Sequence, residues 1–206
     1  MIAISSDRVL EWGGLDLTIF GVHRDWFGNP VDPPVGWSLA IDPVRLWFVA
    51  TRRQPARGHP DAAPGAFAAG LWRHDVAELF LAAPEGGRYL ELNLAPNGAW
   101  WSCEFTAPRR RAHEEDREWP DVRTHAETQA DGSWITAMSL PLSSLRDRLD
   151  FGPGTMANVS FILDSPALRF LSVTRLGGDE PDFHQPEKFA PLRIHDGDLP
   201  GSGNAP

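Results

Sequence analysis

The residues of this chain best suited to binding chemistry lie within one short stretch. They are Trp72, His74, Glu78, Glu91 and Asn93. An indole offers a flat apolar surface with one N–H donor, whereas imidazole, carboxylate and amide groups donate or accept hydrogen bonds. One stacking plane surrounded by several polar groups is the chemistry needed to bind a pyranose ring.

Strand alternation would place these side chains on one face of a sheet. Around Glu78, leucines alternate with other residues, so if the leucines face the core, Glu78 points from the opposite face. His74 would then share that face, and so would Trp72 if the strand begins early. The glutamate and asparagine of segment 89–94 alternate with leucines in the same way and would meet Glu78 across the sheet. The alternative is that this face is simply the solvated side of the sheet.

Short apolar runs rich in β-branched and aromatic residues recur between turn signals, a pattern typical of an all-β domain. The turns at 85–87, 96–98 and 131–132 contain glycine and polar residues that tolerate positive φ. We expect an antiparallel β-sandwich, with layers of the immunoglobulin-like or jelly-roll type and one short helix at 142–149. The expected strands are 16–20, 37–41, 46–51, 77–82, 89–94, 100–105, 122–128, 134–140, 158–163 and 170–174.

Length and composition limit the possibilities. The chain has 206 residues, 42% of them hydrophobic, so we predict a single domain over 1–195 and a disordered tail, rich in Gly and Pro, over 196–206. The single cysteine cannot form an internal disulfide, and no run of eighteen apolar residues occurs. A net charge of −9 disfavours nucleic acid. We therefore expect a cytoplasmic protein without a nucleic-acid or membrane partner.

Five segments, taken in order, give the chain a family resemblance. They resemble the family 9 carbohydrate-binding modules and the wider DOMON-like superfamily, and the resemblance covers roughly Trp72 to Ile194. The segments are Trp72 through Glu78 to Phe80, then 89–100, then 132–145, then Pro153-Gly154 with 158–161, and last Pro181-Asp182-Phe183-His184 with Phe189.

This resemblance implies a sugar-binding site. In sugar-binding members a Trp and a Glu six residues later contact the sugar, a spacing that Trp72 and Glu78 match. The following strand supplies further polar contacts there, which implies a role for Glu91 or Asn93. Candidates for a second stacking aromatic are Phe170, Trp101 and Phe183.

We expect a loop near the C-terminal end of the domain to close this site. It runs from Arg175 to His184, and Arg175, Asp182 and His184 would contribute polar contacts. A small-molecule ligand, a sugar or a sugar-derived metabolite, is therefore the expected partner.

Three other interpretations remain open. No cofactor or metal is predicted, but other members of the superfamily bind haem through Met and His, and here Met138 and Met156 would have to serve. Calcium would draw on the acidic residues at 179–182. An enzyme would use His184 with Asp182 or Glu78 as acid and base. The sequence contains no hydrolase or nucleotide-binding motif that favours an enzyme.

Overall fold

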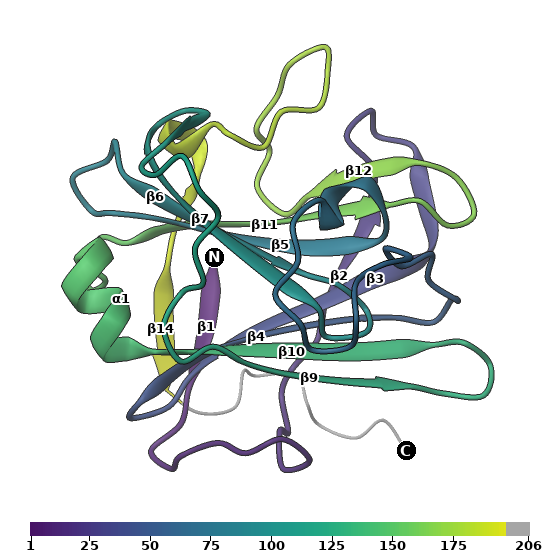
Figure 1. Cartoon of the computed structure of the whole chain (residues 1–206), viewed down its shortest axis with the longest axis horizontal. Helices are drawn as coiled ribbons and strands as arrows, with labels where there is room; N and C mark the ends of the chain where they lie inside the picture. The colour runs from purple at the N-terminus through teal and green to yellow at the C-terminus, as the bar shows by residue number, and fades with distance from the viewer. Residues whose placement is uncertain (197–206) are drawn as a thin grey trace.

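Alternating apolar and polar residues build two β-sheets that pack face to face in the computed structural model, which describes residues 1–196 (Figure 1). Within that range each sheet has seven strands, and most neighbouring strands are antiparallel. The predicted antiparallel β-sandwich is confirmed.

The first sheet contains both the N-terminal and the C-terminal strand of the described chain. These two strands, β1 and β14, run parallel to each other, and β1 also pairs in parallel with β3. Strand β2 (Phe20–Arg24) also pairs with β3 but stands outside the linear order of the other six strands. The order along the sheet is β14 (Arg193–Asp196), β1 (Ile2–Ser5), β3 (Pro30–Ile41), β4 (Arg45–Arg52), β10 (Trp134–Pro141) and β9 (Arg123–Thr128).

The second sheet is built around an antiparallel meander of three strands, β5, β6 and β7. The short strand β13 (Ala190–Pro191) pairs with β11 but stands outside the linear order of the other six strands. The order is β12 (Arg169–Ser172), β11 (Met156–Leu163), β5 (Val76–Ala82), β6 (Tyr89–Leu94), β7 (Trp100–Ala107) and β8 (Arg110–Arg111).

The main core lies between the sheets. Leucines of β5 and β6 meet apolar side chains of β3 and β4 there, including Leu39 and Phe48. The only α-helix of residues 1–196, α1 (Leu142–Leu149), adds three leucines to the same core at one end of the sandwich. Two 3₁₀ helices, η1 (Leu71–Arg73) and η2 (Pro186–Lys188), lie in connecting segments.

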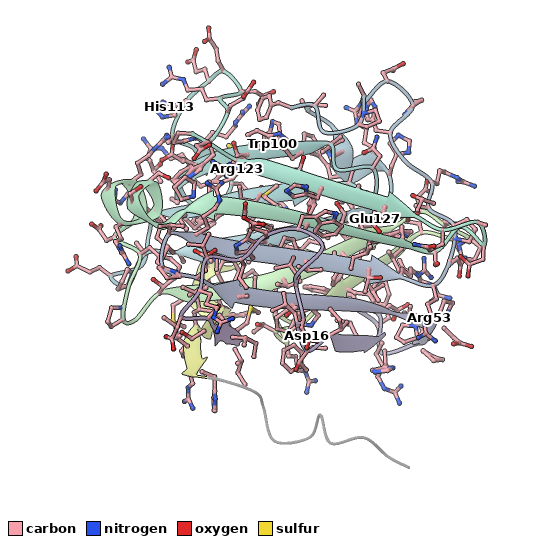
Figure 2. All side chains as sticks on the ribbon, turned by 90° about the horizontal axis from the view of Figure 1, so that it is seen from below. Asp16, Arg53, Trp100, His113, Arg123 and Glu127 are labelled. Carbon is pink, nitrogen blue, oxygen red and sulfur yellow. The ribbon has the colours of Figure 1, made fainter. Side chains whose placement is uncertain are left out.

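Each sheet also has apolar residues on its outer face. On the first sheet, Trp47 and Val49 are covered by a segment that includes Leu15 and Leu17. Figure 2 shows this segment, which carries Asp16, crossing in front of the strands. On the second sheet, Phe80, Tyr89 and Trp101 belong to a separate buried cluster. Loops cover both outer faces, so neither sheet has a fully solvated side.

Most predicted elements are confirmed. Strand β6 and helix α1 have the predicted bounds, and eight further predicted strands overlap observed ones. The strand expected at 16–20 is wrong except for Phe20, which begins β2. Residues 16–19 form no strand, and Leu17 packs onto the first sheet without strand pairing. Strands β1 and β14 were not predicted. Apart from Asp196, which ends β14, the predicted tail lies outside the described residues. No helix in residues 1–196 is long and apolar enough to span a membrane.

Candidate ligand-binding pocket

The outer face of the second sheet holds a pocket of about 460 Å³, a volume within the usual range for small-molecule sites. It lies where the segment 181–184 and the turn after β7 approach strands β5 and β6. Its lining residues are Trp72, Glu78, Phe80, Glu91, Trp101, Phe105, Arg109, Arg111, Ile162, Phe170, Pro181, Phe183 and His184.

Two glutamates on neighbouring strands lie in this pocket. Glu78 of β5 pairs across the sheet with Asn93 of β6, and Glu91 lies two residues before Asn93 on the same face. Only 3% of Glu78 and 5% of Glu91 are exposed. The solvated-face alternative is therefore wrong, because the loops over this sheet bury the polar residues of its outer face.

Each of the two carboxyl groups has one hydrogen-bond donor from a neighbouring side chain. Ser160 Oγ donates to Glu78 Oε2 at 2.8 Å, and Asn93 Nδ2 donates to Glu91 Oε1 at 3.0 Å. Burial raises the pKa of Glu78 well above its ordinary value, and repulsion from Glu91 adds to that rise. Burial likewise raises the pKa of Glu91, although the Asn93 bond acts in the opposite direction. Near neutral pH the pair therefore retains a proton that ordinary carboxyls would have lost.

Aromatic side chains form the walls of the pocket. Trp72 of η1 is 39% exposed and meets Trp101 edge to face, with ring centroids 5.4 Å apart. Trp101 points outward because alternation along β7 turns Trp100 into the main core. The ring centroids of Phe170 and Phe183 lie 6.4 Å apart, and these two side chains form another part of the pocket wall. An exposed indole that shares a pocket with buried carboxyls can stack on the apolar face of a ligand ring while the carboxyls bind polar groups at the edge of that ring.

His184 lies beside Glu91 as a neutral base. Its Nδ1 is 2.8 Å from the Tyr89 hydroxyl, which already accepts the backbone N–H of Arg109 and can therefore donate its own proton to the imidazole. Its Nε2 lies 3.7 Å from Glu91 Oε2. Burial, helped by nearby Arg109, lowers the pKa of His184 to about 4. At neutral pH this imidazole carries no charge.

Two arginines at the rim are engaged with other carboxylates. Arg109 Nη2 donates to Asp182 Oδ1 at 2.8 Å. Arg111 pairs with Asp116, and its Nε donates to the thiol of Cys103 at 3.2 Å. Both guanidinium groups line the pocket while these carboxylates neutralise their charge.

Four residues expected at the site from sequence do not line the pocket. His74 lies 3.8 Å from an oxygen of Asp164, because strand β5 begins only at Val76 and alternation does not extend back to position 74. Asn93 is fully buried beneath the pocket and acts through Glu91. Arg175 lines a separate hollow beside Trp26. Asp182 binds Arg109 at the rim.

The enzyme interpretation pairs His184 with Asp182 or with Glu78. Glu78 and His184 both line the pocket, whereas Asp182 and His184 do not form a side-chain pair. Asp182 accepts the backbone N–H of His184 at 2.9 Å, not a ring proton. The imidazole instead contacts Tyr89 and Glu91. The acid–base pair of His184 with Asp182 predicted from sequence is therefore not assembled.

The two methionines considered for haem lie outside the pocket. Met138 is fully buried in the main core, and Met156 is partly buried against the cluster on the outer face of the second sheet. Neither lines the pocket. Within residues 1–196, no group of three or more His, Cys, Asp or Glu side chains is arranged to hold a metal ion.

Sequence reasoning missed several lining residues. It assigned no role to Arg109 and Arg111, but the hairpin of β7 and β8 brings them over the outer face. Alternation along β7 could have identified Phe105 as an outward residue. Trp101, Phe170 and Phe183, the three candidates for a second stacking aromatic, all line the pocket.

Neither a protein-family model nor a curated protein sequence matches the chain. In structure, the chain is similar to a candidate carbohydrate-binding protein from Bacteroides uniformis ATCC 8492. The two share 16% identity over 95% of this chain and 98% of that one, with a TM-score of 0.69.

The chain is also similar to a family 9 carbohydrate-binding module from Caldicellulosiruptor kristjanssonii. That module in complex with glucose matches over 96% of both chains, at 12% identity and a TM-score of 0.60. The same module in complex with cellotriose covers 100% of this chain at the same identity and TM-score. At such identities the similarity shows the fold alone, which is that of a carbohydrate-binding module.

Proposed function

We propose that this protein is a non-catalytic binding domain for a small ligand, a sugar or a sugar-derived metabolite. The ring of the ligand would stack on Trp72, and its polar groups would bind Glu78, Glu91 and His184. We also assign the chain to the DOMON-like superfamily, on the motifs between Trp72 and Ile194. A cytoplasmic location, part of the same proposal, favours a small soluble sugar over a polymer.

The observation that carries this proposal is the pairing of an exposed indole with buried acceptors in one pocket. Trp72 is among the few large hydrophobic side chains that remain exposed, and it lies beside a pocket that also contains Glu78 and Glu91. A mostly apolar cavity with a few convergent polar groups is typical of small-molecule sites. The carbohydrate-binding neighbours support a sugar as the ligand class.

Replacing Trp72 by alanine is expected to weaken sugar binding about tenfold, because the variant loses both the stacking contact and its apolar area. Intrinsic tryptophan fluorescence, titrated with glucose, cellotriose and glucuronic acid, would identify the sugar. Isothermal calorimetry would then compare the affinities of the parent and of Trp72→Ala.

Trp12→Ala is a matched control, since Trp12 lies on the outer face of the other sheet, where it stacks on His125 with ring centroids 5.3 Å apart. We expect this variant to bind the sugar like the parent. If Trp72→Ala bound as tightly as the parent, or if no sugar or sugar acid bound at all, the proposal would be rejected.

A further inference from the structure

The two carboxyl groups of the pocket lack a cationic partner in the described part of the chain. Glu78 forms no ion pair there, and its recorded hydrogen bond occupies only Oε2. Glu91 uses Oε1 for Asn93, and the nearest basic atom to its Oε2 is Nε2 of His184, 3.7 Å away. Each carboxyl thus has one oxygen without a hydrogen-bond donor from residues 1–196.

The other ionisable groups around the pair compensate its charge only in part. His184 is neutral, and burial raises the pKa values of Tyr89 and Cys103, so these two groups are neutral as well. Arg109 and Arg111 favour the ionised form of Glu91 from a distance, but each forms its ion pair with an aspartate and neither forms one with Glu78 or Glu91. Once both glutamates ionise, the base of the pocket therefore carries a net negative charge.

Two buried like charges are costly unless a cation compensates them. We infer that the ligand supplies this cation: the pocket takes a sugar that bears a primary amine, and Glu78 and Glu91 hold its ammonium group. A metal ion suits the site less, because the described residues offer no cluster of three ligands there. An ammonium needs only hydrogen-bond acceptors, and the oxygens left free on both glutamates can accept its protons.

The walls of the pocket suit the same ligand. Trp72, Trp101 and Phe105 line the cavity, and aromatic rings attract a nearby cation. The Arg111 guanidinium already lies 5.6 Å from the centroid of the Trp101 ring, so the exposed indole of Trp72 is the ring best placed to meet a cation of the ligand. The inference extends the proposed function, since it accepts a sugar as the ligand and adds the chemical group that the sugar must carry.

Proton exchange gives this inference a distinctive signature. In the free protein the pair retains a proton near neutral pH, because burial raises both pKa values. An ammonium stabilises the ionised pair, so its binding releases protons and becomes tighter as the pH rises through the pKa values of the pair. A neutral sugar does not favour the ionised form of the glutamate pair, so its binding should not release protons in this way.

The test compares glucosamine, glucose and N-acetylglucosamine by calorimetry between about pH 5.5 and pH 7, in buffers of different ionisation enthalpy. We expect glucosamine to bind about tenfold more tightly than either neutral sugar at pH 7, the effect of one charge-assisted hydrogen bond. We also expect this advantage to shrink toward pH 5.5, and glucosamine to release more protons than glucose.

Two variants identify the residue responsible. In Glu78→Gln the ratio of glucosamine to glucose affinity should fall toward one, because the amide is neutral and still accepts the Ser160 bond. Glu85→Gln removes the same charge from an exposed hairpin and should keep the parent ratio. Thermal melts would verify that both variants are folded.

The possible outcomes separate the two proposals. Glucose binding as tightly as glucosamine would overturn the amine inference and leave sugar binding intact. A preference for glucosamine that persists in Glu78→Gln would overturn the role assigned to that residue. If none of the three sugars bound, both the inference and the proposed function would fall.

Discussion

Replacing Asp75 by alanine is expected to lower the free energy of unfolding by about 3 kcal/mol, because three backbone N–H groups lose a charged acceptor. Asp75 is 1% exposed. Its Oδ1 accepts the N–H groups of Asp164 at 2.5 Å and Ser165 at 3.2 Å, and its Oδ2 accepts that of Arg57 at 2.6 Å. The carboxylate thereby ties two loops to the start of β5, the strand that carries Glu78.

Urea unfolding followed by circular dichroism would measure this loss. Asp75→Asn should lower the free energy of unfolding less than Asp75→Ala does, since the amide oxygen can still accept hydrogen bonds from two of the three N–H groups. Asp147→Ala removes an exposed carboxylate from α1 and should change stability by less than about 0.5 kcal/mol. Equal stability of Asp75→Ala and Asp147→Ala would show that Asp75 does not tie these loops.

The second large effect is a loss of stability at alkaline pH caused by the carboxyl pair. The pKa values of Glu78 and Glu91 in the folded state lie above the ordinary value of 4.5. The protonated pair therefore makes its full contribution to the free energy of unfolding below pH 4.5. That contribution is lost as the pH rises through the folded-state pKa values of the two glutamates. Between pH 5 and pH 8 we expect the parent to lose on the order of 2 kcal/mol relative to Glu78→Gln, since one pKa unit corresponds to about 1.4 kcal/mol.

This comparison uses chemical denaturation of the parent and of Glu78→Gln in the same buffers. Asp75, whose pKa burial also raises, and His184, whose pKa burial lowers, titrate in both proteins, so their effects cancel to a first approximation. Glu85→Gln, the exposed control, should follow the parent at every pH. A constant stability difference between parent and Glu78→Gln from pH 5 to pH 8 would contradict a buried, protonated pair.

Much of the fold is predictable because side-chain period and turn chemistry are local properties. The strict alternation of leucines in β6 and the leucine spacing of α1 give the observed bounds of both elements. Alternation also predicts that Glu78 and Glu91 share the outer face of the second sheet. These predictions need no knowledge of distant segments.

The part of the fold that the sequence does not predict depends on contacts between residues far apart in the chain. Strand β1 pairs with β14 at the opposite end of the described chain, a partner that local pattern cannot identify. The segment around Leu15 and Leu17 has strand-like alternation, but it packs over the first sheet without joining it. Alternation records which side of a segment is buried, whether or not a neighbouring strand supplies hydrogen bonds.

The same limit applies to the candidate site. Trp72 and Glu78 lie in one pocket, and so does His184, which comes from a distant loop. His74 was expected there as well, but Asp75 turns inward to bind loop backbone and the strand begins only after it. Burial of Glu78 and Glu91 results from loops over the sheet, so their raised pKa values could not be predicted from the strands alone.

The central claim is that this pocket on the second sheet binds a sugar through Trp72 and the glutamate pair. A crystal structure of the protein soaked with the tightest-binding sugar from the titrations tests it most directly. We predict a sugar ring against Trp72, with its polar groups within hydrogen-bond distance of Glu78 and Glu91. A saturated crystal in which the sugar lies elsewhere, and this pocket holds only solvent, would contradict the claim.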